Sequence, residues 1–174
     1  LQVVNSALTK IGAPLITQAQ LDDGSTKEAR LTKERLPHTR LNLLRLHPWN
    51  EAITRTKFNA TNNTFTDGTS GTLTTPAFNF SYSLTLPTNC LRVLDVYDSD
   101  KDYRIEGGKL FSNIQTPEIL YVSDLALTSF SPTLVEALAY SLAYDISYSI
   151  TQSQGVWEMA ERGYQICLAR AKTI

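Results

Sequence analysis

The stretch that decides the fold is residues 130–143, Phe-Ser-Pro-Thr-Leu-Val-Glu-Ala-Leu-Ala-Tyr-Ser-Leu-Ala. Ser131 followed by Pro132 is typical of a helix start, with serine as the N-cap and proline at the first helical position. From Leu134 onward, leucines recur every four residues among alanines, which predicts a buried stripe that a neighbouring helix can approach closely. Helical sequence therefore resumes here after a long segment that lacks it.

Two helices are predicted before that segment. Residues 1–11 have apolar side chains at helical spacing, and a glycine and a proline end the pattern. Residues 26–46 form a longer, charged helix, for which Ser25 and Glu28 have the spacing of a capping box. Pro37 lies inside it, which predicts a kink or the meeting of two helices, because proline removes a backbone hydrogen bond.

A last amphipathic helix is predicted over residues 156–172, after a break at Gly155. The side chains that we expect to face inward are Val156, Met159, Ile166 and Cys167.

The middle of the chain has the pattern of short strands. Residues 53–59 alternate loosely, and residues 78–84 alternate strictly between apolar and polar. Residues 60–75 are rich in Thr, Asn, Gly and Ser, which predicts a long mobile loop or hairpin tip. Gly107-Gly108 is a strong hairpin-turn signal. Further short strands are predicted at residues 91–97, 103–105, 109–112 and 118–122.

These elements predict an α+β protein in which a four-helix bundle carries an inserted small antiparallel β meander. Residues 1–52 and 131–174 would form the bundle. Residues 53–130 would form the β-rich insertion, with its mobile loop near residues 60–75.

The composition is that of an ordinary globular protein. Of the 174 residues, 42% are hydrophobic and 19% charged, and the formal net charge is −1, which gives the molecule as a whole no electrostatic preference for nucleic acid or anionic membrane. The longest apolar stretch, residues 134–150, contains two acids and several hydroxyls, so we expect no membrane span and a soluble protein. Cys90 and Cys167 are far apart in sequence, which favours two buried thiols in a reducing compartment.

No set of residues in the sequence has the spacing of a catalytic or metal site. His38 and His47 are nine residues apart, which is no known ligand spacing, and we interpret both as solvated or capping side chains. Asp98, Asp100 and Asp102 alternate as in a calcium loop, but the glycine and final Glu of that motif are missing, which favours a solvated turn. We therefore expect no enzyme, no metal and no cofactor.

Charge is nevertheless uneven along the chain. Between Lys27 and Lys57, eight bases stand against three acids, whereas between Asp95 and Asp145 nine acids stand against three bases. A solvated helix face followed by acidic turns would give this distribution without any functional meaning. The functional interpretation is a dipolar subunit whose basic helix faces an acidic partner, another copy or DNA.

The order of several motifs resembles the head-to-tail adaptor proteins of short-tailed bacteriophages, the tail tubular protein A-like family. Each motif is weak alone, and their order over most of the chain carries the resemblance. The motifs are Val4-Asn5-Ser6-Ala7-Leu8 with Ile11-Gly12, Pro48-Trp49, Leu86-Pro87, Cys90-Leu91-Arg92-Val93, Tyr103 to Leu110, Leu120-Tyr121, Phe130-Ser131-Pro132 and Glu136-Ala137-Leu138-Ala139.

The resemblance implies a structural subunit of the virion tail or neck, assembled in the host cytoplasm. Such subunits form a homo-oligomeric ring, a dodecamer, beneath the portal protein, extend the DNA channel with non-specific contact to the genome, and carry nozzle or fibre proteins. A ring of this kind needs two different contact patches on each subunit. We expect subunit or portal contacts at Lys27, Arg30, Lys33, Arg40, Arg162, Arg170 and Lys172. Inter-subunit or tail contacts on the insertion are expected at Phe78, Phe80, Tyr82 and Tyr103.

Two alternatives remain. A head-completion or connector protein of a long-tailed phage or gene transfer agent would share the helical core, although its β portion tends to be smaller. A DNA-binding module acting through residues 27–57 would be recognised by a steep salt dependence of its affinity for duplex DNA.

Overall fold

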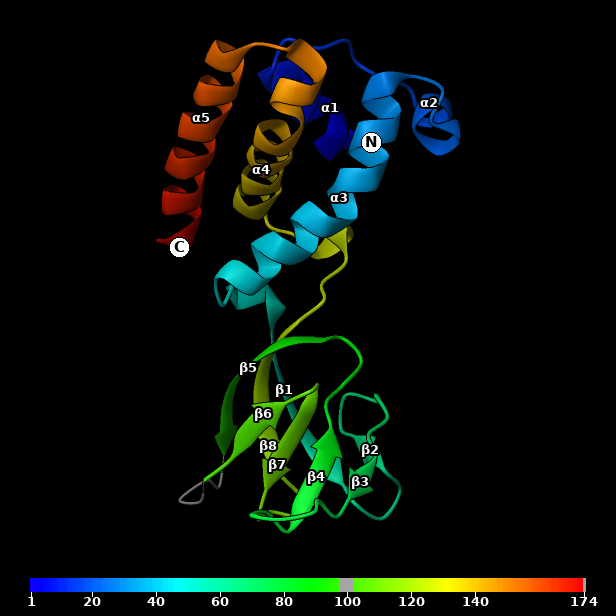
Figure 1. The fold of residues 1–174 in the computed structure, drawn as a ribbon, viewed down its shortest axis with the longest axis vertical. Helices are drawn as coiled ribbons and strands as arrows, with labels where there is room; N and C mark the ends of the chain where they lie inside the picture. Colours follow the sequence, from blue (N-terminus) through cyan, green and yellow to red (C-terminus); the bar gives the residue numbers. More distant parts are fainter. Residues whose placement is uncertain (98–101, 174) are drawn as a thin grey trace. The chain divides into compact units, whose positions relative to one another are not determined.

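A computed structural model describes residues 1–97 and 102–173. The chain divides into two compact units. Residues 1–47 and 125–174 form the first, which we call the helical unit, and residues 48–124 form the second, the β unit. Both ends of the chain thus contribute to the helical unit, while the β unit is one continuous segment (Figure 1).

The helical unit is built around one central helix. The α-helices are α1 (Gln2–Lys10), α2 (Gln18–Asp23), α3 (Lys27–Leu46), α4 (Pro132–Thr151) and α5 (Gln154–Lys172), and a 3-10 turn, η2, covers Leu127–Ser129. Helix α4 packs against α1, α3 and α5, and α2 packs against α3. In Figure 1, α4 lies between α5 on one side and α3 on the other.

Local signals explain most of the helix ends. Ser131 caps α4 by accepting a hydrogen bond from the backbone N–H of Leu134, with proline next in the chain. Helix α3 is capped by Thr26 rather than by the predicted Ser25. It continues through Pro37 as one helix, and its axis changes direction part-way along (Figure 1).

The core of the helical unit is made of aliphatic and small side chains. Leu8 and Ile11, from α1 and the residue after it, pack with Leu142, Ala143 and Ile146 of α4. Small residues also line the α4–α5 contact, where α5 buries Ala160 and Ala171. The prediction that Met159 and Ile166 face inward is wrong, because these side chains are 51% and 55% exposed.

The β unit contains two sheets. Its elements are the 3-10 turn η1 (Asn50–Ala52) and the strands β1 (Ile53–Asn59), β2 (Thr64–Phe65), β3 (Leu73–Thr74), β4 (Tyr82–Thr85), β5 (Cys90–Tyr97), β6 (Arg104–Glu106), β7 (Lys109–Ser112) and β8 (Glu118–Ser123). One sheet has the order β2-β1-β8-β5 and the other β3-β4-β7-β6, with antiparallel pairing throughout the described strands.

Both sheets contribute to one core. Phe58, Val96 and Ile119 come from the first sheet and Leu84 and Leu110 from the second, and all five are buried in the same cluster. Side chains that alternate with these along each strand point to the opposite face of their sheet.

The predicted four-helix bundle with a small β meander is wrong. Within the described residues, five α-helices accompany two four-stranded antiparallel sheets, so the α+β protein has a different architecture. Helix α2 was not predicted, because it buries no residue and so has no apolar stripe. A meander pairs neighbouring strands in order, whereas β8, the last strand, pairs between β1 and β5.

Three predicted segments of the β unit can be compared with the structure. The strictly alternating residues 78–84 become a strand only from Tyr82, since Asn79 has a left-handed φ of 69° that interrupts an extended chain. The Gly107-Gly108 turn is confirmed as the hairpin between β6 and β7, with φ values of 55° and 74°. Residues 60–75 contain β2 and β3, and the mobility of this segment stays a prediction.

Candidate interaction surfaces

The bases predicted on α3 differ in how available they are. The side chains of Lys27 and Arg30 are exposed and form no hydrogen bond or ion pair with the described residues. Lys33 donates to the backbone carbonyl of Asp22 in α2. Arg40 is half-buried, and its Nη1 donates to the Leu125 carbonyl at 2.6 Å. Arg40 therefore has a role within the helical unit, whereas Lys27 and Arg30 can contact a partner.

The bases predicted on α5 lie on the other side of α4 (Figure 1). Arg162, Arg170 and Lys172 are all exposed. The last two lie in the final turn, where a positive charge is favourable beside the free backbone carbonyls of a helix end. The bases of α3 and α5 thus form two separate groups rather than one patch.

Exposed apolar side chains accompany the bases of α5. Met159 and Ile166 are seven residues apart, and Arg162 lies between them on the same helical face. Large apolar groups that gather with a base on one face are typical of a surface that binds another protein.

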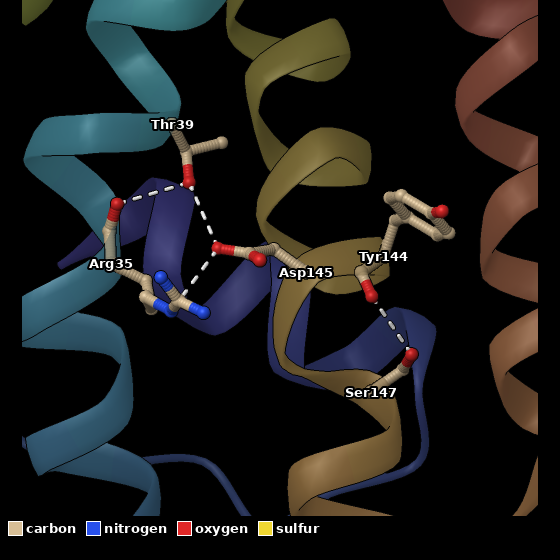
Figure 2. A network of polar contacts seen from close by, with 5 residues as sticks. All are labelled: Arg35, Thr39, Tyr144, Asp145 and Ser147. Carbon is tan, nitrogen blue, oxygen red and sulfur yellow. Dashed lines mark hydrogen bonds and ion pairs between the residues drawn. The ribbon is translucent and has the colours of Figure 1, made fainter.

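Part of the predicted charge asymmetry is neutralised inside the chain. Figure 2 shows Asp145 of α4 between Arg35 and Thr39 of α3, with its Oδ2 3.5 Å from Arg35 Nε and 3.4 Å from Thr39 Oγ1. In the β unit, Lys57 Nζ lies 2.9 Å from Glu118 Oε1. Two acids of the predicted acidic segment therefore bind bases of the predicted basic segment in the same chain.

The four aromatic residues predicted as contacts on the insertion are not equivalent. Phe78 is 76% exposed, and Phe80 is half-buried with its ring 6.4 Å from that of Phe111. Tyr82 and Tyr103 are both half-buried, and Tyr103 packs against the core of the β unit. Phe78 is thus the most available of the four.

A groove of about 550 Å³ opens beside these phenylalanines. Phe78 and Phe80 line it from the segment before β4, and Phe111 lines it from β7. Its charged residues are Arg104, Glu106 and Lys109. The predicted contacts do not include Phe111, Arg104 or Lys109, although alternation along β6 and β7 places these three residues on one face of that hairpin.

One buried polar group in the β unit has a strongly shifted pKa. Tyr121 is fully buried, and its hydroxyl group donates to Asp67 Oδ2 at 2.7 Å and lies 3.0 Å from Asn89 Oδ1. Burial and the neighbouring carboxylate raise the pKa of Tyr121 well above its usual value. Burial by itself raises the pKa of Asp67, but hydrogen bonds from Tyr121 and Thr69 outweigh it, and the net shift is downward. The contact holds a turn of the β unit in place.

Other polar residues fall outside any cluster with evident chemistry. His38 is exposed, and His47 ends α3. Asp98 and Asp100, part of the alternating acids, lie outside the described residues. Cys90 and Cys167 are half-buried thiols, and burial raises the pKa of Cys167. The described residues include no group of three or more His, Cys, Asp or Glu side chains suited to a metal ion.

No helix in the described ranges is both long and apolar enough to cross a bilayer. Comparison of the sequence with models of protein families and with curated proteins gives no match.

Proposed function

We propose that this protein is a structural subunit of a bacteriophage head-to-tail adaptor ring, which binds beneath the portal, extends the DNA channel and carries nozzle or fibre proteins. The observation that carries the proposal is the order of adaptor-like motifs along most of the chain, from residues 4–12 to residues 130–139. Its site of action would be the virion neck, after assembly in the host cytoplasm.

The helical unit has the separate contact surfaces that a ring subunit needs. In a closed ring each subunit presents two different patches, one to each neighbour. Helix α5 offers Met159 and Ile166 with Arg162, and α3 on the other side of α4 offers Lys27 and Arg30. We assign the α5 face to a neighbouring copy, because its exposed apolar side chains lose contact with water on association.

The bases of α3 fit a different type of partner. Lys27 and Arg30 lie within one turn and form no ion pair with the described residues, so their charge is available to an acidic surface on the portal, or to DNA phosphates in the channel. Their exposure makes such contacts sensitive to salt.

The test is electron microscopy of the full chain mixed with its cognate portal. The wild-type protein should form a complete ring beneath the portal. Ile166→Glu places a charge in the α5 face and should abolish the ring, whereas the combined change Lys27→Glu and Arg30→Glu should weaken binding to the portal.

Ile105→Glu is the matched control for the apolar face, since Ile105 is a 42% exposed apolar side chain that belongs to the β unit and not to the helical unit. Arg45→Glu is the control for the bases, because Arg45 is an exposed base at the far end of the same helix. Both control variants should form rings. The absence of rings with wild-type protein, or rings unchanged by Ile166→Glu, would contradict the proposal. Duplex binding that falls steeply with salt, without ring formation, would favour a DNA-binding module instead.

A further inference from the structure

The groove beside Phe78 lies on the outward face of the sheet β3-β4-β7-β6. Leu84 of β4 and Leu110 of β7 point into the core, so the residues that alternate with them point the other way. Ser83 and Phe111 are paired across these strands, and Arg104 of β6 pairs with Phe111. Residues 74–80 also line the groove.

The groove is lined by three phenyl rings. The rings of Phe80 and Phe111 are 6.4 Å apart and inclined by 49°, a favourable aromatic contact, and Phe78 adds a third ring that is 76% exposed. Phenylalanine offers no hydrogen-bonding group, so these rings favour an apolar side chain over a polar ligand. Aromatic rings in a hollow are also typical anchor sites of protein interfaces.

The charged side chains of the groove favour an acidic neighbour. Arg104 and Lys109 stand against Glu106 alone, so the groove has an excess of one positive charge. The Arg104 to Glu106 contact is long, at 3.9 Å, and both side chains are mostly exposed, so it neutralises Arg104 only weakly. Lys109 forms no ion pair with the described residues.

We propose that this groove binds a short linear segment of a partner protein that presents a large apolar side chain flanked by Asp or Glu. The apolar side chain packs among the rings of Phe78, Phe80 and Phe111, and the acidic groups lie beside Arg104 and Lys109. The inference rests on the proposed function, in which the protein carries nozzle or fibre proteins. A single-stranded nucleic acid fits less well, since the proteins that bind it use strongly positive grooves.

The experiment uses short random linear peptides displayed on yeast and selected against the full-length protein. Selected sequences should combine a large apolar residue with Asp or Glu, and their affinity should fall as salt is raised. Phe78→Ala should weaken binding about tenfold. Because Phe78 is largely exposed, this change leaves the fold intact.

Charge changes in the groove give opposite results. Lys109→Glu should weaken binding of the selected peptides by about tenfold, because it replaces a positive charge of the groove by a negative one. Glu106→Lys should strengthen binding, because it makes the opposite replacement. Ile105→Ala is the control, since Ile105 pairs with the inward-facing Leu110 and lies on the other face of β6.

The proposal is overturned if no peptide is selected, if selected peptides bind Phe78→Ala as tightly as wild type, or if they are basic. It is also overturned if a single-stranded oligonucleotide or an oligosaccharide, and no peptide, perturbs the NMR signals of Phe78 and Phe111. Ring formation on the portal should be the same in Phe78→Ala as in wild type. The peptide experiment therefore tests binding at the groove, and ring formation tests the adaptor function separately.

Discussion

Gly163 lies where α5 comes closest to Tyr140 of α4. A Cβ atom at position 163 would be 2.4 Å from Cε1 of that ring and 2.8 Å from Cδ1. Lys10 Nζ lies 4.1 Å from the centroid of this ring and 2.7 Å from Glu136 Oε1, so a shift of the ring would disturb these contacts. The residue without a side chain thus allows two helices to pack at this separation.

We expect Gly163→Ala to lower the free energy of unfolding by about 1–3 kcal/mol, because the added methyl group overpacks the contact. This loss should exceed the gain from the higher helix propensity of alanine, about 1 kcal/mol. Urea denaturation of the two proteins measures the difference. Gly155→Ala is the matched control, because the atom nearest to a Cβ added at position 155 is Ser153 Oγ, at 4.0 Å. This change should leave the free energy of unfolding unchanged or raise it. Equal stability of Gly163→Ala and wild type would show that the Tyr140 ring moves to accommodate the added methyl group.

Single residues also show where sequence reasoning succeeded. The Ser131 cap was predicted because its signal lies in two adjacent residues. The buried face of α5 was not predicted correctly. Because α5 lies close to α4, it buries the small residues Ala160 and Ala171 and leaves Met159 and Ile166 exposed. An apolar pattern indicates which residues can be buried, but the neighbouring helix determines which ones are.

At the scale of elements, Tyr121 joins three parts of the β unit. It belongs to β8, while Asp67 lies in the turn between β2 and β3, and Asn89 precedes β5. The turn that contains Asp67 is polar and was predicted to be a mobile loop. Phe65 and Gly71 of the same segment are buried, and a Cβ at Gly71 would be 2.7 Å from the Phe65 ring. The segment therefore packs through a few positions that its composition does not reveal.

We expect Tyr121→Phe to lower the free energy of unfolding by about 1.5–3 kcal/mol at pH 7, the range for a hydrogen bond to a charged group. The pKa of Asp67 is lowered from 3.8 in the folded protein, so the stabilisation from its carboxylate is present above that value and is lost as the pH falls through the folded pKa. The difference in the free energy of unfolding between Tyr121→Phe and wild type should therefore become smaller below about pH 4.

Urea denaturation at pH 7 and at pH 3 measures this effect. Tyr97→Phe is the matched control, because Tyr97 is exposed and its hydroxyl group accepts only a long bond, 3.3 Å from Arg55 Nη1, among the contacts of the described residues. It should change stability little at either pH. A Tyr121→Phe effect that is constant with pH would exclude the Asp67 carboxylate as its source.

For the whole molecule, the division into two units means that local changes have separate consequences. Gly163 belongs to the helical unit and Tyr121 to the β unit. We expect hydrogen exchange to show faster opening of α4 and α5 in Gly163→Ala, with the strands of the β unit unchanged, and the reverse in Tyr121→Phe. Faster exchange throughout the chain in either variant would show that the two units unfold as one.

The elements that depend on neighbouring residues were predictable from the chain alone: the capped start of α4, the long charged α3, the strand β1 and the turn at Gly107-Gly108. These follow from capping, periodicity and turn geometry, which act over a few residues. Three features were not predictable in this way: β8 pairs between β1 and β5, a second sheet forms, and Phe78, Phe111 and Lys109 line one groove. Strand order and surface grouping depend on contacts between residues far apart in sequence, whose free energy comes from burial in a shared core rather than from local pattern.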